Sequence, residues 1–181
     1  MPVTAPTLPP TAHPWHIRPL DHRDVDQLLH LQTMCYGDDF QESRTAFAQR
    51  LGCAHHCSVG VASTAGAALQ AYLAAYWSNP GKITPLDGHF TAPAAGEQVL
   101  YLHDISVLPA LSGQGLARHL VRHGMQQARQ RGLRQATLVS VQGSQSYWER
   151  QGFSVYPVMD AQQYLHLQTY GEGAVYMTAT L

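Results

Sequence analysis

Two spacings of apolar residues run through the chain, one typical of strands and one typical of helices. Short runs rich in β-branched and aromatic residues predict strands over residues 15–20, 57–62, 69–77, 99–108, 135–141, 153–159 and 174–181. Apolar residues three and four positions apart predict helices over residues 21–36, 43–51, 115–131 and 144–151. Residues 160–170 fit either a helical turn or a loop.

Capping residues support the helix ends. Asp21, with Asp24 three positions later, suits the first turn of the first helix. Gly52 and Gly132 suit the ends of the second helix and of the helix over residues 115–131. The latter helix has the clearest apolar stripe of the chain, formed by Ala117, Leu120, Val121, Gly124 and Ala128.

The order of these elements predicts the fold class. A strand, two helices, three strands, a helix, a strand, a helix and two strands make a mixed α/β sheet with helices on both faces. The order differs from the regular alternation of a doubly wound nucleotide-binding fold. We expect one domain over residues 15–181 after a flexible, proline-rich start at 1–14. The irregular stretch 78–98 has a length that is usually functional or disordered.

Charge and composition exclude several classes of partner. Eleven Lys and Arg residues oppose twelve Asp and Glu residues, and no basic stripe marks a nucleic-acid binder or a membrane-surface helix. The chain shows neither the apolar run of a signal peptide nor a stretch long enough to span a bilayer, so we expect a cytoplasmic protein. Cys53 and Cys57 flank two histidines, but without a second ligand pair they do not predict a metal site.

One segment carries a pattern suited to anion binding. The strand that ends near Leu108 runs into a turn with Gly113 and Gly115, which opens a helix. Unpaired backbone N–H groups and the helix dipole favour a pyrophosphate there. Arg118 occupies the third glycine position of a dinucleotide fingerprint, and the Gly-Lys-Ser/Thr of a P-loop is absent from the sequence. A plain strand-to-helix connection stays open as an alternative.

Two blocks of residues give the segment a more specific meaning. The first reads Ser112-Gly113-Gln114-Gly115-Leu116-Ala117. It resembles the Arg/Gln-x-x-Gly-x-Gly/Ala motif of the GNAT superfamily of N-acetyltransferases. The second resembles the late aromatic-Tyr-Glu-Lys-Leu-Gly-Phe block of that family, and reads Tyr147-Trp148-Glu149-Arg150-Gln151-Gly152-Phe153. The resemblance extends from Trp15 to the carboxyl end.

The resemblance implies a splayed, mostly antiparallel sheet with acetyl-CoA as cosubstrate across the edge of the strand 99–108, and it implies no metal. Main-chain groups of Ile105, Ser106 and Val107 would hold the pantetheine arm. The pyrophosphate and neighbouring parts of CoA would contact Ser112, Gly113, Gln114, Gly115, Leu116, Ala117, Ser144 and Tyr147. Two positions depart from the family pattern: Ser112 replaces Arg or Gln, and Trp148 replaces a tyrosine that often serves as general acid.

Three residues are candidates for catalysis. His103 and Asp104 lie on the central strand, where polyamine acetyltransferases of the superfamily often carry Glu-Asp, and we expect their side chains on opposite faces. An imidazole, which ordinarily titrates near ~6.5, suits removal of a proton from the acceptor. Tyr147 would assist the leaving thiol. Alternatively, His103 is a hydrogen-bonded core residue and Asp104 orients backbone.

These observations predict an N-acetyltransferase that moves an acetyl group from acetyl-CoA to the primary amine of a small or amino-acid-like acceptor. Two alternatives stay open: a protein or peptide N-acetyltransferase, and a non-catalytic acyl-CoA sensor. A homodimer is compatible with the sequence, which does not name the acceptor.

Overall fold

A mixed sheet of seven strands forms the centre of the molecule, as the computed structural model shows for residues 15–37 and 39–181. The expected proline-rich start at residues 1–14 lies outside the described residues. The strand order is β1-β2-β3-β4-β5-β7-β6, and every pair is antiparallel except β4 with β5. The strands are β1 (His16–Pro19), β2 (Val59–Ala62), β3 (Leu69–Ser78), β4 (Val99–Val107), β5 (Gln135–Ser140), β6 (Ser154–Val155) and β7 (Val175–Thr180). The prediction of a mixed, mostly antiparallel sheet is confirmed.

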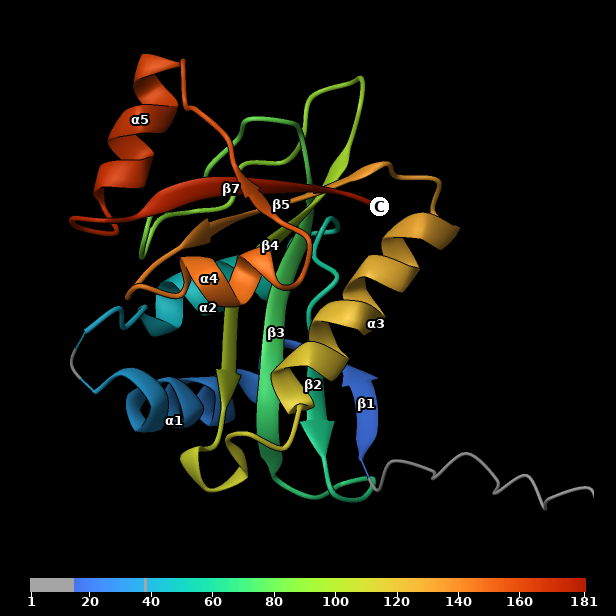
Figure 1. The fold of residues 1–181 in the computed structure, drawn as a ribbon. Helices are drawn as coiled ribbons and strands as arrows, with labels where there is room; N and C mark the ends of the chain where they lie inside the picture. Colours follow the sequence, from blue (N-terminus) through green and yellow to red (C-terminus); the bar gives the residue numbers. More distant parts are fainter. Residues whose placement is uncertain (1–14, 38) are drawn as a thin grey trace, which may run out of the picture.

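Helices cover both faces of this sheet (Figure 1). One face carries α3 and α4, and the opposite face carries α1 and α2. The elements are the 3-10 turns η1 (His22–Asp24) and η2 (Pro109–Leu111), and the helices α1 (Val25–Tyr36), α2 (Arg44–Leu51), α3 (Leu116–Gln130), α4 (Gln145–Glu149) and α5 (Ala161–Gln168). None of the helices described is long and apolar enough to cross a membrane.

Local hydrogen bonds explain where the first helices begin. Asp21 and Asp24 form a reciprocal capping box at η1, which continues into α1. Asp24 also pairs with Arg18 at 2.6 Å, which ties this turn to β1. Ser43 caps α2 by accepting a hydrogen bond from the backbone N–H of Ala46. The capping predicted from the aspartate pair is confirmed.

Successive residues of β3 point to different cores. Leu73 faces the cluster under α3, which also contains Leu120 and Ala128, whereas Tyr72 faces the cluster under α1 and α2. A Cβ at Gly124 would lie 3.2 Å from Leu73, so the missing side chain lets α3 approach the sheet closely. Full burial of a leucine such as Leu120 stabilises the fold by about 1.5–3 kcal/mol.

Two expected elements near the carboxyl end differ from the structure. The strand expected at residues 153–159 shortens to two residues, because Phe153 turns into the core and Pro157 has no N–H for a ladder. Residues 160–170, expected as a turn or a loop, contain the helix α5, which Asp160 caps. This helix packs against the loop after β3, since His166 contacts the backbone oxygen of Ile83 at 2.8 Å.

A β-bulge in β4 changes which side chains share a face. Asp104 pairs with Ala74 and Leu102 pairs with Ala75, so His103 is an extra residue between two regular pairs. His103 then contacts Arg50 on α2, and Asp104 contacts Tyr36 on α1. The expectation that His103 and Asp104 face opposite sides is therefore wrong, because the bulge turns both toward α1 and α2.

Candidate active site

The parallel strands β4 and β5 separate beyond the pair of Leu102 and Leu138. The rest of β5 stays paired with β7, so β4 is left with an open edge at the bulge. A cavity of about 230 Å³ fills the opening. Its wall comes from α1, the three central strands and the segment around α4, and consists of Tyr36, Leu73, Leu102, His103, Asp104, Ile105, Leu138, Val139, Val141, Gln142, Ser144, Tyr147 and Trp148. We call it the splay cavity.

A second, smaller cavity adjoins the splay cavity on the side of α1 and α2. The two cavities share five wall residues, which are Tyr36, His103, Asp104, Val139 and Val141. The remaining wall includes Phe40, Glu42, Gln32, Leu86 and Tyr170. It opens on the bulge from the side opposite α3. We call it the acceptor cavity, after the role that is proposed for it under Proposed function.

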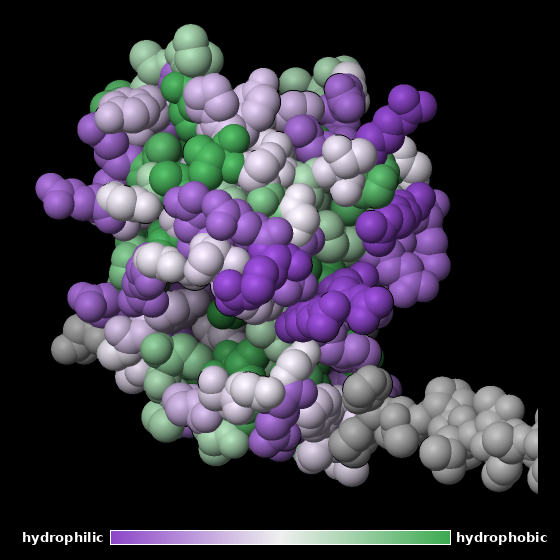
Figure 2. Space-filling model, viewed as in Figure 1, coloured by the Kyte–Doolittle hydropathy of each residue, from purple (hydrophilic) through white to green (hydrophobic). Residues whose placement is uncertain are grey.

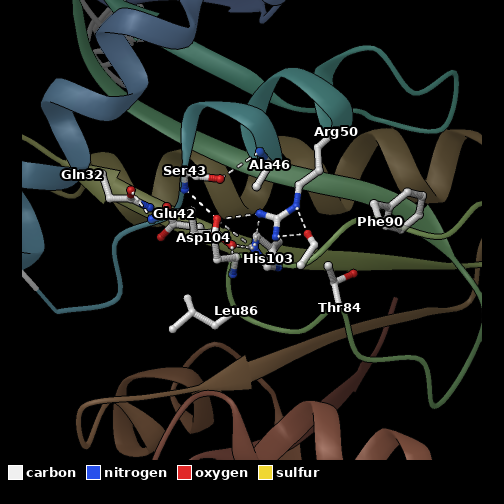
Figure 3. A network of polar contacts seen from close by, with 12 residues as sticks. Gln32, Glu42, Ser43, Ala46, Arg50, Thr84, Leu86, Phe90, His103 and Asp104 are labelled. Carbon is white, nitrogen blue, oxygen red and sulfur yellow. Dashed lines mark hydrogen bonds and ion pairs between the residues drawn. The ribbon is translucent and has the colours of Figure 1, made fainter.

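A buried network joins Glu42 and His103, which line the acceptor cavity, to Arg50 behind them (Figure 3). Arg50 Nη1 lies 2.6 Å from Glu42 Oε2 and 2.7 Å from His103 Nε2. Glu42 Oε1 lies 3.0 Å from the same His103 nitrogen. Figure 3 shows the three side chains pointing toward one another, with Glu42 and Arg50 coming from the segment around α2 and His103 from β4.

Backbone groups complete the polar contacts of this network. The fully buried guanidinium of Arg50 donates to the carbonyl oxygens of Gly88 and Pro85. Glu42 Oε1 accepts from the backbone N–H of Asp87 at 3.0 Å. Burial alone would raise the pKa of Glu42, but the contacts with His103 and Arg50 outweigh it and hold that pKa well below the ordinary value. The loop after β3 is therefore anchored to α2 by charge-assisted hydrogen bonds.

Both ring nitrogens of His103 face protein groups. Nε2 lies within hydrogen-bonding distance of Arg50 and Glu42, and Nδ1 lies 3.4 Å from the hydroxyl of Tyr170. The side chain is 1% exposed. The Tyr170 hydroxyl in turn donates to the carbonyl oxygen of Thr84 at 2.6 Å. An acceptor amine would therefore have to displace an existing contact to reach either nitrogen.

The carboxylate of Asp104 lies between two tyrosine hydroxyls. Tyr36 donates to Oδ1 at 2.7 Å, and Tyr72 donates to Oδ2. Burial raises the pKa of Asp104, and the two donated hydrogen bonds counteract part of this shift by stabilising the charged form. The buried hydroxyl of Ser106 has no hydrogen-bond partner among the described residues.

The turn before α3 forms a groove that leads to the splay cavity. Gly113 and Gly115 have φ angles of 78° and 80°, a left-handed conformation that favours glycine. No atom lies within 4 Å of a Cβ built on either residue, so the space in front of the turn is open. The wall is formed by Val107, Leu111, Ser112, Gly113, Gly115, Leu116, Ala117, Arg118, Tyr147 and Gln151. Figure 2 shows apolar side chains in the recess below α4, beside the start of α3.

Tyr147 lies where this groove meets the splay cavity, since it lines both. Its buried hydroxyl has no partner among the described residues, and burial raises its pKa. Its neighbour Trp148 packs into the core against Phe153. Of the other predicted CoA contacts, Ser144 lines the splay cavity and contacts Ser140 at 3.0 Å.

The structure brings most of the predicted site residues together. His103, Asp104, Ile105, Ser144 and Tyr147 line the splay cavity, whereas the groove contains Val107, Ser112, Gly113, Gly115, Leu116 and Ala117. Gln114 is exposed in the turn, and the side chain of Ser106 faces α1. Sequence reasoning missed the partners on α1, α2, β3 and after α5, which are Tyr36, Glu42, Arg50, Tyr72 and Tyr170. Nothing in their local pattern separates them from ordinary helix and strand residues.

Among residues 15–37 and 39–181, no group of three or more His, Cys, Asp or Glu side chains is arranged to hold an ion. Cys53 and Cys57 are free thiols, and burial raises the pKa of Cys57.

Residues 25–153 match the acetyltransferase (GNAT) family. The chain belongs to this family. It is thus an acetyltransferase of the GNAT type, and the family uses acyl-CoA as its donor. A search of curated proteins found no significant match.

Solved structures show the same fold at low sequence identity. The ribosomal-protein-S18-alanine N-acetyltransferase of Escherichia coli superposes with a TM-score of 0.65 and 19% identity, covering 92% of this chain and 93% of that one. The loading GNATL domain of CurA from Lyngbya majuscula gives 0.66 and 14%, with 92% and 97% covered. The PaiA N-acetyltransferase of Thermoplasma acidophilum, in complex with coenzyme A, gives 0.63 and 12%, with 92% and 99% covered.

Proposed function

We propose that this enzyme transfers the acetyl group of acetyl-CoA to the primary amine of a small molecule, at the bulge of β4. The observation that carries the proposal is the pair of cavities that meet at His103 and Asp104. One adjoins, at Tyr147, the groove of the glycine turn before α3, and the other borders a buried polar network. A donor and an acceptor entering from the two sides would meet at these residues.

The donor would lie along the groove and the splay cavity. Backbone N–H groups at the start of α3 would bind the pyrophosphate, because the first turn of a helix leaves them without internal acceptors. Gly113, Gly115 and Ala117 line this part of the groove. The open edge of β4 from Ile105 to Val107 would bind the pantetheine arm, which places the thioester near Tyr147.

The charges around the acceptor cavity favour a cationic partner. Glu42 and Asp104 are carboxylic acids in its wall, and Arg50 behind them contributes one positive charge. An ammonium group is attracted to a site with an excess of carboxylate, and a base in the site must then take its proton before the amine attacks. An amine acceptor therefore fits this cavity better than an anionic one.

The acceptor cavity is small, about 30 Å³, with room for little more than an amino group, and its closed wall favours a small molecule over a protein. Leu86 from the loop after β3, Phe40 before α2 and Tyr170 after α5 close around the cavity. The loop is held by the Arg50 contacts and by a hydrogen bond from the Leu86 N–H to Thr169. A protein acceptor would need an open groove here, in which a peptide could extend past the reactive amine.

Catalysis would begin with a neutral amine attacking the thioester carbon. A C–N bond forms, the C–S bond breaks and the electron pair goes to sulfur, while one proton must leave the nitrogen. A thiol with a pKa near ~8.5 is a fair leaving group. Because burial raises the pKa of Tyr147, its hydroxyl stays protonated and can donate a hydrogen bond to the developing thiolate. His103 and Asp104 are the candidate bases.

A screen of acceptors tests the proposal directly. Purified protein is mixed with acetyl-CoA and a panel of small amines, amino acids and short peptides, and free thiol is followed with a chromogenic reagent. We expect thiol release with one class of small primary amine. Release only with peptides would favour the protein-acetyltransferase alternative. Acetyl-CoA binding without release from any acceptor would favour the sensor.

A further inference from the structure

Tyr36 connects the end of α1 to Asp104 on β4. It is the last residue of α1, and its hydroxyl reaches the bulge of β4. It lines both the splay cavity and the acceptor cavity. An amine that attacks a thioester in the splay cavity from the acceptor cavity would therefore pass this side chain.

Hydrogen bonding gives the Tyr36 hydroxyl a fixed direction. Its proton points to Asp104 Oδ1 at 2.7 Å, and its oxygen lies 3.2 Å from the carbonyl oxygen of Ile105. A hydroxyl that donates once still has lone pairs that can accept. The oxygen of Tyr36 can thus accept a hydrogen bond from an incoming N–H while its own proton stays directed at Asp104.

We propose that Tyr36 is a catalytic residue that takes the proton of the acceptor amine and passes its own hydroxyl proton to Asp104. This inference rests on the proposed function, and it adds a residue from α1 to the reaction. As the C–N bond forms, the amine proton moves to the Tyr36 oxygen and the Tyr36 proton moves to Asp104 Oδ1. The leaving sulfur takes a proton from solvent, and Asp104 returns one to solvent through Tyr36, so protons balance.

Two properties of Asp104 suit it to receive the proton from Tyr36. Burial raises its pKa, which makes the carboxylate a stronger base than an exposed aspartate. The second oxygen is held by the Tyr72 hydroxyl, so the carboxylate cannot rotate freely. In contrast, both nitrogens of His103 already face buried groups.

Tyr72 provides a matched control for Tyr36. Both tyrosines donate to the same carboxylate, and replacing either with phenylalanine removes one oxygen atom. Tyr72 is fully buried, and it is not one of the residues that line the two cavities. If Tyr36 merely oriented Asp104, the two variants would lose similar activity.

The experiment compares steady-state rates of wild type, Tyr36→Phe and Tyr72→Phe with the best amine from the screen. We expect Tyr36→Phe to lower kcat by roughly 10²–10³-fold with little change in either KM, because proton transfer and not binding is affected. Tyr72→Phe should lower kcat by less than roughly tenfold. Thermal melts with and without acetyl-CoA confirm that both variants fold and bind donor.

Equal losses in the two variants would overturn the relay and leave Tyr36 as a positioning residue. Wild-type rates in Tyr36→Phe would also overturn it, while the proposed acetyl transfer would stand. Failure of the proposed function looks different, because the wild type itself would then release no thiol with any small amine.

Discussion

His103 and Asp104 are neighbours in the chain, yet their surroundings suit them for different tasks. Both residues line the two cavities, but the imidazole nitrogens face Arg50, Glu42 and Tyr170, whereas the carboxylate of Asp104 accepts a hydrogen bond from Tyr36, which lines the same cavities. The two candidate bases therefore predict different pH dependences.

The pH–rate profile separates these candidates. If His103 takes the proton directly, His103→Ala lowers kcat/KM by roughly 10²–10⁴-fold and removes the acidic limb of the profile. We expect instead that His103→Ala keeps the acidic limb and that Asp104→Asn loses it, because both ring nitrogens are engaged and Asp104 ends the proposed relay. A profile that loses its acidic limb only in His103→Ala would restore the histidine as base.

At the scale of elements, one buried ion pair joins α2 to the segment before it and to the loop after β3. Breaking a buried pair from one side leaves the other charge without compensation, which is strongly destabilising. Glu42 and Arg50 form such a pair, and both side chains are almost fully buried.

Stability should therefore depend on Glu42 and on pH. Glu42→Gln is expected to lower the free energy of unfolding at pH 7 by about 3 kcal/mol, measured by urea denaturation. The contacts of Glu42 hold its pKa below the ordinary value, so its contribution is complete above the ordinary glutamate range near ~4.3. This contribution is lost as pH falls through that range toward the lowered pKa. The difference in free energy of unfolding between wild type and Glu42→Gln should therefore shrink.

Glu149→Gln, at an exposed helix end, serves as control. An unchanged difference at low pH would contradict this account.

The first turn of α3 can be tested without straining the backbone. Gly113 and Gly115 have positive φ, so a larger residue there would disturb the turn itself. Ala117 lines the groove within the regular helix. Ala117→Glu places a negative charge where the pyrophosphate would bind, and at a helix start this charge favours the helix.

We expect Ala117→Glu to melt at or above the wild-type temperature without ligand and to lose most of the stabilisation that acetyl-CoA gives. Ala117→Gln, which has a side chain of equal size without the charge, should keep more of the stabilisation by acetyl-CoA. Differential scanning fluorimetry over a series of acetyl-CoA concentrations measures both effects. Equal acetyl-CoA shifts in the two variants would argue against a pyrophosphate at this turn.

At the scale of the whole molecule, the acceptor cavity is assembled from segments that are distant in sequence. Leu86 comes from the loop after β3, Phe40 precedes α2 and Tyr170 follows α5. Acceptor choice should therefore respond to the loop while donor binding does not, because the groove proposed for CoA lies at α3.

Leu86→Ala tests this separation. Loss of the apolar wall should raise the acceptor KM by roughly tenfold, about 1.4 kcal/mol, and leave the KM of acetyl-CoA unchanged. Steady-state kinetics with each substrate varied in turn measure the two constants. Leu165→Ala, at an exposed position of α5, is the control. Parallel increases in both KM values would show that the loop supports the whole site and does not select the acceptor.

The sequence predicted local features better than long-range ones. The glycine turn, the helix after it and the alternation of strands follow from short spacings, so most element positions and the glycine turn before α3 could be predicted from the sequence. The bulge at His103 could not be predicted from the sequence, because an extra residue in β4 does not change the local sequence pattern. It is evident only from the pairing of β4 with β3. The Glu42–Arg50 pair was missed for a similar reason, since burial of charge depends on the loop that covers it.

The bulge has a consequence for how such sites can diverge between relatives. Of the residues of β4, His103 alone has no partner on β3. If it were lost, Leu102 and Asp104 would become neighbours opposite Ala75 and Ala74, and the ladder would stay in register on both sides. Gain or loss of a single codon at this point would thus add or remove an imidazole beside the reacting groups without a change of fold. Homologous genes that differ by one codon here would be expected to encode the same architecture with different chemistry.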